Sequence, residues 1–205
     1  MITGVFGGSF DPPHIGHAIV AMHARESLGL RRVLVVPAGT PPHKLDRRLA
    51  PADVRLAMVR AMVAGDEGFG VDGREVERSG PSFTVETLRD LARTEGEGLV
   101  LLMGVDQFRE FDTWHEPAEI LRLARLAVLD RGAPGGAAPR VDAPHTRVRV
   151  PRIDISSSGV RDRVARGLSV RYLVAEPVRR IIERERLYRA PASADGPVER
   201  DRGSC

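Results

Sequence analysis

Apolar runs alternate along this chain with segments in which apolar residues recur at helical spacing. The runs are bounded by glycine, proline or charged residues and predict buried strands at residues 2–6, 32–36, 99–103, 126–129 and 147–150. The helical spacing predicts helices at residues 15–28, 52–64, 84–93, 116–123, 157–166 and 176–185. Strands that alternate with helices predict an α/β fold, with a mainly parallel sheet and helices on both of its faces.

Apolar residues at helical spacing share one face in three of these helices. They are Ile15, Ile19 and Met22 in the first, Val54, Met58 and Met62 in the second, and Val178, Ile181 and Ile182 in the last. Residues 69–77 suggest a short strand pair, whereas proline and glycine predict loops at 37–51 and 132–144. We expect one domain over residues 1–189, whose helices from about residue 156 form a small C-terminal subregion, and a disordered tail over residues 190–205.

The length and the charge balance narrow the class of protein. At 205 residues, folding hides roughly 70–75% of the extended chain's surface, enough for a core without metal or disulfides. The formal net charge is only +3 and aromatic residues make up 4%, which argues against a nucleic-acid-binding protein. The single cysteine, Cys205, allows no intramolecular disulfide, and no leader or apolar run suggests secretion or a membrane span. We therefore expect a soluble cytoplasmic protein.

The strongest local signal lies where the first predicted strand meets the first predicted helix. Residues 7–17 read GGSFDPPHIGH, with Gly7, Gly8, Ser9 and Phe10 in the turn. Ligands of open α/β sheets lie beyond the carboxyl ends of the strands, where a helix N-terminus offers unpaired amides to phosphate. A glycine pair alone is also typical of a simple tight turn, so the histidines that follow decide between the two interpretations.

His14 and His17 lie three residues apart and therefore share one face of the predicted helix. Beside a polyphosphate the charged imidazole is favoured, so both rings can donate hydrogen bonds to phosphoryl oxygens. Gly16 removes a side chain that would keep a flat ligand off the helix. Histidines at this spacing can also share a zinc ion, but no third ligand is clearly placed, and Asp11 has the more ordinary task of capping. We expect phosphate binding and no protein-held metal.

A second signal lies late in the chain, where residues 155–161 read ISSSGVR at a predicted helix start. Ser156, Ser157 and Ser158 can cap the helix or hold a phosphate together with its amides. Arg161 lies one turn further along, with a planar fork that suits phosphate oxygens. By itself this pattern is more typical of capping.

Taken together, the two signals resemble the nucleotidylyltransferase superfamily, with its G-x-F-D-P-x-H-x-G-H and I-S-S-T-x-x-R signatures. Ser158 stands where threonine is usual, and it keeps the hydroxyl. The four residues from His14 to His17 also resemble the adenylate-forming motif of class I aminoacyl-tRNA synthetases, whose second motif is rich in lysine instead. The resemblance implies a Rossmann-like open sheet and transfer of a nucleotide to a phosphate acceptor.

Three further stretches resemble the bacterial nicotinate mononucleotide adenylyltransferases. They are residues 37–44 (PAGTPPHK), 79–88 (SGPSFTVETL) and 103–114 (MGVDQFREFDTW), and the resemblance extends from Ile2 to about Tyr188. It implies transfer of AMP from ATP to nicotinate mononucleotide, with release of pyrophosphate, in NAD biosynthesis. Nicotinamide mononucleotide and pantetheine phosphate stay open as alternative acceptors, as does a catalytically silent nucleotide sensor.

The resemblance also implies roles for individual residues. The catalytic set is His14, His17, Lys44 and Arg161. The ATP- and phosphate-binding set is Gly7, Gly8, Ser9, Phe10, Gly16, Asp106, Ser156, Ser157 and Ser158. The nicotinate-binding set is Thr84, Trp114 and His115. We expect in-line attack without a covalent enzyme intermediate, Mg²⁺ held mainly by substrate phosphates, and ATP and nicotinate mononucleotide as ligands. The sequence leaves a homo-oligomer open.

Overall fold

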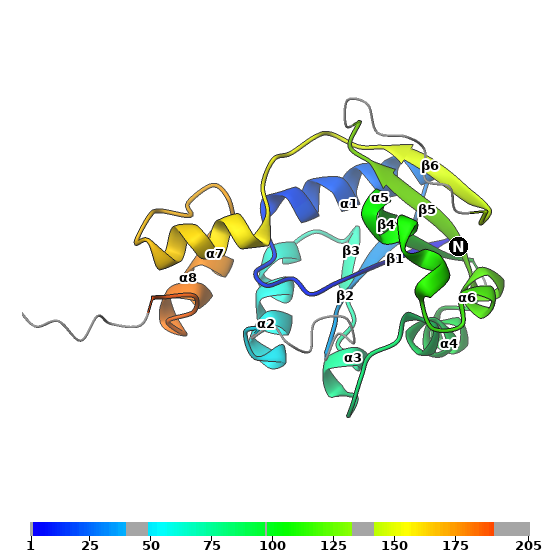
Figure 1. Cartoon of the computed structure of the whole chain (residues 1–205), viewed down its shortest axis with the longest axis horizontal. Helices are drawn as coiled ribbons and strands as arrows, with labels where there is room; N and C mark the ends of the chain where they lie inside the picture. The colour runs from blue at the N-terminus through cyan, green and yellow to red at the C-terminus, as the bar shows by residue number, and fades with distance from the viewer. Residues whose placement is uncertain (1, 40–48, 97, 133–141, 191–205) are drawn as a thin grey trace, which may run out of the picture.

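Six parallel strands form one sheet at the centre of the molecule (Figure 1). The computed structural model describes residues 2–39, 49–96, 98–132 and 142–190. The strands are β1 (Thr3–Gly8), β2 (Arg32–Pro37), β3 (Phe69–Val71), β4 (Leu99–Gly104), β5 (Ala124–Asp130) and β6 (His145–Arg149). Their order is β3-β2-β1-β4-β5-β6, and all neighbouring pairs are parallel. The predicted α/β fold is confirmed, and the strand order reverses between β1 and β4, where such sheets bind ligands.

Helices connect the strands and cover both faces of the sheet. They are α1 (Ile15–Leu28), α2 (Ala52–Val63), α3 (Arg74–Glu77), α4 (Thr84–Glu95), α5 (Val105–Arg109), the 3-10 helix η2 (Phe111–Thr113), α6 (Pro117–Leu123), α7 (Ser157–Ala165) and α8 (Glu176–Arg184). Among the described residues, no helix is long and apolar enough to cross a membrane.

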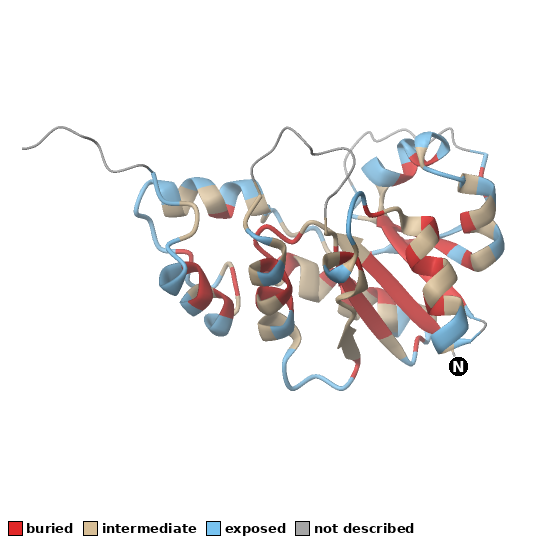
Figure 2. Cartoon of the chain, turned by 90° about the horizontal axis from the view of Figure 1, so that it is seen from below, coloured by how far each residue is buried: buried red, intermediate tan, exposed pale blue. Residues whose placement is uncertain are grey.

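The central strands are buried on both faces, so successive residues belong to two different apolar clusters. Val5 and Leu101 pack with α4, α5 and α6, whereas their neighbours Phe6 and Leu102 pack with α1. Figure 2 shows the buried positions concentrated in these strands. The unbroken apolar runs of the sequence follow from this double burial, because neither face of the strand meets water.

The structure differs from the sequence prediction in three places. Residues 69–77 form strand β3 and helix α3 instead of a strand pair. Helices α5 and η2 were not predicted, since each is too short to show helical periodicity. In α1 the fully buried positions are Gly16, Val20, Ala21 and Ala24, and the predicted Ile15, Ile19 and Met22 are only partly buried. These small residues let α1 lie close to the sheet.

Helices α7 and α8 lie to one side of the sheet, next to α2 (Figure 1). Their apolar residues form a third cluster, in which Val178 and Ile182 of α8 pack together with Met58 of α2. The inward positions predicted for α8 are confirmed, since Val178, Ile181 and Ile182 are all buried. The backbone amide of Ile15 donates a hydrogen bond to the carbonyl of Leu173 (3.0 Å), which joins the start of α1 to the connection between α7 and α8.

Candidate active site

A cavity of about 850 Å³ opens at the point where the strand order reverses. Its floor includes the carboxyl ends of β1 and β4, at Gly7–Gly8 and Met103–Gly104. Eleven of the residues predicted for the site line it: Gly7, Gly8, Ser9, Phe10, His17, Thr84, Trp114, His115, Ser157, Ser158 and Arg161. Segments separated by more than a hundred positions therefore share one cavity.

The two histidines at the start of α1 occupy different environments. Their rings stack with centroids 3.7 Å apart, but only His17 lines the cavity, whereas His14 is buried. The backbone amide of His14 donates to Nδ1 of His17 (3.1 Å). Because Nδ1 accepts this bond, the proton of the neutral His17 ring belongs on Nε2, which becomes the donor available to a ligand.

Burial keeps both imidazoles neutral when no ligand is present. Desolvation, followed by the nearby charge of Arg131, lowers the pKa of His14 to about 4. Desolvation, His14 and Arg131 also lower the pKa of His17 well below its usual value. The charged rings expected beside a polyphosphate therefore require the ligand itself, whose negative charge raises the pKa of a neighbouring imidazole.

Stability should fall as the pH is lowered from about 6.5 towards 4. In this range the unfolded chain binds a proton at His14 that the folded protein resists, so the stability present above pH 6.5 is lost. We expect the free energy of unfolding, measured with urea, to decrease between pH 7.5 and pH 5 in both the wild type and His14→Asn. The decrease should be about 2 kcal/mol smaller in His14→Asn than in the wild type. Burial raises the pKa of Glu75, which changes stability with pH in the opposite direction. Because Glu75 is present in both proteins, its contribution cancels when His14→Asn is compared with the wild type. His23→Asn, on the same helix, is the control, and equal pH dependence in His14→Asn and wild type would contradict the assignment.

The start of α7 is joined directly to the turn between β1 and α1. The Ser157 hydroxyl donates to the carbonyl of Pro12 (2.9 Å), and Nη1 of Arg161 donates to the carbonyl of Asp11 (2.6 Å). Ser156 caps α7 by accepting from the amide of Gly159 (3.1 Å) and does not line the cavity. The three serines therefore have different positions: Ser156 caps the helix, whereas Ser157 and Ser158 line the cavity.

A buried arginine that the sequence analysis did not single out supports both loops at the cavity mouth. The guanidinium of Arg55 in α2 is 1% exposed and donates to four backbone carbonyls. These carbonyls belong to Ser9 (2.8 Å), Ala38 (2.5 Å), Gly39 (2.8 Å) and Ala50 (3.0 Å). Arg55 thus ties the turn after β1 to both described ends of the loop after β2.

Asp11 does not cap α1, contrary to the sequence prediction. His14 occupies the cap position, and the Asp11 carboxylate accepts hydrogen bonds from the amide of Ala50 (3.2 Å) and the hydroxyl of Tyr188 (2.6 Å). Both donors come from distant parts of the chain, 39 and 177 positions from Asp11. The spacing in the sequence suggested the backbone amides of α1 as partners of this carboxylate, whereas its partners in the structure are Ala50 and Tyr188.

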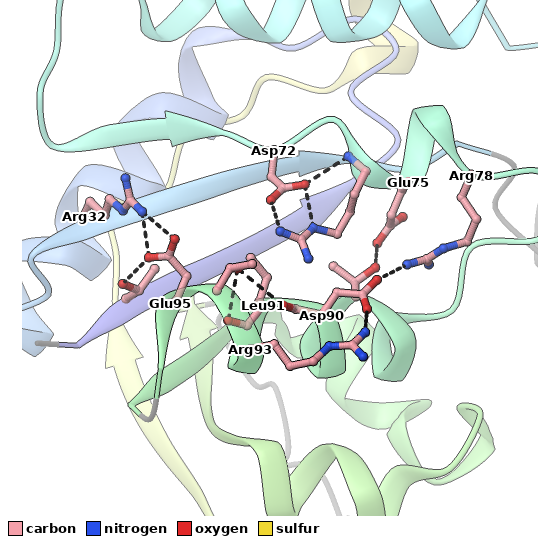
Figure 3. A network of polar contacts seen from close by, with 12 residues as sticks. Arg32, Asp72, Glu75, Arg78, Asp90, Leu91, Arg93 and Glu95 are labelled. Atoms are coloured by element: carbon pink, nitrogen blue, oxygen red, sulfur yellow. Dashed lines mark hydrogen bonds and ion pairs between the residues drawn. The ribbon is translucent and has the colours of Figure 1, made fainter.

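The opposite wall of the cavity is formed by α3, α4 and the segment around Trp114. Figure 3 shows polar contacts between α3 and α4, in which Thr87 donates to the buried Glu75 carboxylate (2.7 Å) and Arg78 to Asp90 (2.8 Å). These contacts join α3 to α4, whose first residue, Thr84, lines the cavity. His115 packs on Phe83 with ring centroids 4.6 Å apart, next to Trp114.

Four predicted site residues lie elsewhere in the described structure. Asp106 points to solvent with a 93% exposed side chain and pairs with Arg109 (2.9 Å). Gly16 is covered by the protein, since a Cβ there would lie 3.0 Å from Nδ1 of His14. The glycine therefore makes room for the imidazole at the N-cap of α1. His14 and Ser156 also fall outside the cavity lining, and Lys44 lies outside the described residues.

Arg131 is a further cavity residue that the sequence analysis missed. It follows β5, lines the cavity and is close enough to both histidines to lower their pKa values. Its position directly after a predicted strand was an available signal, because residues at strand carboxyl ends converge on the site. Together with Arg161 it places two guanidiniums near the start of α1, where they can bind an anionic group of a ligand.

The chemistry of the cavity favours anion binding over a protein metal centre. In the part of the chain that the structure describes, no group of three or more His, Cys, Asp or Glu side chains is arranged to hold a metal. Nδ1 of His14 is buried without a hydrogen-bond partner there, but one imidazole does not make a metal site. The lining offers donors in the His17 ring, in hydroxyls and in two guanidiniums, and its carboxylates are those of Asp11, Glu75, Glu110 and Glu116.

Comparison with known proteins assigns this arrangement to a family. Residues 5–163 match the family model described as cytidylyltransferase-like. The chain is 44% identical over 196 residues to a probable nicotinate-nucleotide adenylyltransferase of Thermomicrobium roseum, and the alignment covers 91% of each chain. It is 42% identical over 190 residues to a protein of the same name from Thermus thermophilus, covering 92% of this chain and all of the relative.

Solved structures show the same fold at low sequence identity. The Plasmodium falciparum nicotinic acid mononucleotide adenylyltransferase complexed with NaAD superposes with a TM-score of 0.73 at 16% identity, covering 91% of this chain and 96% of that one. A putative nicotinate-nucleotide adenylyltransferase of Vibrio parahaemolyticus gives 0.65 at 19% identity, over 93% and 98% of the two chains. From its sequence relatives, the chain belongs to the cytidylyltransferase-like family and, within it, to the nicotinate-nucleotide adenylyltransferases.

Proposed function

We propose that this cavity transfers AMP from ATP to nicotinate mononucleotide, forming nicotinate adenine dinucleotide and pyrophosphate. Family membership supports the reaction. One observation supports the assignment of the site: the glycine-histidine turn and the serine-arginine segment are hydrogen-bonded to each other and line one cavity. Two phosphate-binding segments on one cavity suit a reaction between two phosphorylated substrates.

The triphosphate of ATP is assigned to the end of the cavity between β1 and α7. The backbone of Gly7 and Gly8 lets a phosphate approach closely, and the guanidinium of Arg161 binds anionic oxygens there, because an arginine fork favours phosphate. Nε2 of His17 donates to the phosphoryl group that is transferred. The phosphate of nicotinate mononucleotide attacks the α-phosphorus in line, the bond to the bridging oxygen breaks, and pyrophosphate leaves.

The nicotinate ring is assigned to the opposite end, beside Thr84, Trp114 and His115. Helix α4 begins at Thr84, so its first amides can bind the nicotinate carboxylate. The partly exposed indole of Trp114 offers a flat surface for stacking. In these roles the residues hold and orient the acceptor and take no part in bond making.

We further propose that Mg²⁺ is bound mainly by the phosphates of the substrates. Nucleotidyltransferases generally use Mg²⁺, which would neutralise part of the negative charge of the phosphates when bound. The carboxylate of Asp11 lies in the turn between β1 and α1, residues 9–14, which we call the phosphate turn, and it already accepts hydrogen bonds from Ala50 and Tyr188. The described cavity therefore supplies donors to phosphate and leaves the cation to the substrates.

The choice of acceptor is tested by pyrophosphate release from ATP and each of three acceptors. The backbone amides at the start of α4 favour an anionic group on the acceptor. We therefore expect kcat/KM for nicotinate mononucleotide to exceed kcat/KM for nicotinamide mononucleotide by about tenfold or more. Pantetheine phosphate lacks a pyridine ring and should be slower still. Equal rates for the three would contradict the acceptor assignment, and no pyrophosphate with any acceptor would indicate a nucleotide-binding protein without transferase activity.

A further inference from the structure

Tyr188, beyond the end of α8, reaches back to the phosphate turn at the other end of the chain. Its hydroxyl donates a hydrogen bond to Oδ1 of Asp11 (2.6 Å), 177 positions away in the sequence. The ring packs against the apolar cluster shared by α2, α7 and α8. Burial and the neighbouring Asp11 carboxylate raise the pKa of Tyr188, so its hydroxyl stays a donor at physiological pH.

Asp11 connects this hydroxyl to the arginine assigned to the triphosphate. The residue is 3% exposed, and its carboxylate also accepts from the amide of Ala50 (3.2 Å). Nη1 of Arg161 donates to the Asp11 carbonyl (2.6 Å) and lies 3.7 Å from Oδ2. A buried carboxylate must be satisfied by donors. Arg161 already forms an ion pair with Oδ2, so loss of the Tyr188 hydroxyl leaves the carboxylate short of a donor and should draw the guanidinium closer to it.

We propose that Tyr188 is a positioning residue for the ATP site: by donating to Oδ1 of Asp11, its hydroxyl limits the attraction of the carboxylate for Arg161, whose guanidinium then stays in the cavity lining for the triphosphate. The proposal rests on the proposed function for the assignment of ATP to this cavity. It gives the C-terminal segment a role in substrate binding, although Tyr188 itself does not line the cavity. Tyr188 acts only through Asp11 and Arg161.

The test is ATP binding to Tyr188→Phe, which removes one hydroxyl and keeps the packed ring. We expect the dissociation constant for ATP, measured by calorimetry, to rise about tenfold, since a hydrogen bond to a charged group is lost. KM for ATP should rise by the same factor while kcat changes little. The matched control is Tyr172→Phe, because Tyr172 is the other tyrosine, is 77% exposed and lies outside the cavity lining.

A double-mutant cycle with Arg161→Lys separates positioning from general destabilisation. If Tyr188 acts through Arg161, adding Tyr188→Phe to Arg161→Lys should weaken ATP binding by less than about twofold. Unchanged ATP affinity in folded Tyr188→Phe, or fully additive losses in the cycle, would overturn the proposal. Wild type that binds ATP but releases no pyrophosphate would contradict only the proposed function, whereas wild type that fails to bind ATP would overturn both.

Discussion

His17→Ala should lower kcat for pyrophosphate release by about 10²–10³, the usual effect of removing one donor to a developing charge. The position of His17 and the hydrogen bond to its ring are the reasons to expect a lower kcat. His17 lines the cavity, and the bond from the His14 amide to Nδ1 places the ring proton on Nε2. Because the lost interaction strengthens as charge redistributes in the transition state, KM for ATP should change less than kcat.

The same variant should remain folded. In the described structure the His17 ring accepts one hydrogen bond, at the start of α1, and stacks on the His14 ring, so its removal should cost about 1–2 kcal/mol in urea unfolding, as for a helix cap. His23→Ala on the same helix is the control for kinetics and stability. His17→Asn should recover part of the rate, because the amide offers both an acceptor and a donor. A kcat equal to that of the wild type would exclude His17 as the donor.

Arg55→Met should destabilise the protein by about 3–5 kcal/mol, since it leaves buried polar groups without their partner. Four carbonyls lose their donor at once, and the buried Asp11 carboxylate loses a neighbouring cation. For a domain of this size the melting temperature should fall by roughly 10 °C or more. Urea unfolding and thermal melting measure the effect.

Arg60→Met is the matched control, because Arg60 lies on the exposed side of the same helix α2. It should change stability by less than about 0.5 kcal/mol, as surface substitutions usually do. Arg55→Lys should fall between the two, since an ammonium keeps the charge but cannot reach four carbonyls with a planar fork. If Arg55→Met melted like Arg60→Met, the hydrogen bonds of Arg55 would contribute little net stability.

Local periodicity predicted most of the sheet and helices because each depends on neighbouring residues. The helix over 15–28 was predicted with both boundaries correct, and the central strand at 99–103 lacked only Gly104. The buried face of α1 was less predictable, since close approach to the sheet favoured small residues over the larger apolar ones. The pattern identifies a helix, but packing decides which face is covered.

The sequence by itself determined the α/β fold and pointed to the two segments for which we propose phosphate binding, because strand length, helical period and turn residues are local properties. Only the tertiary structure decided that His17 and not His14 faces the cavity, that Asp106 points to solvent, and that Arg55 and Tyr188 support the phosphate turn. The physical reason is distance along the chain: the partner of a buried charge is set by how the whole fold closes, and no local spacing encodes it.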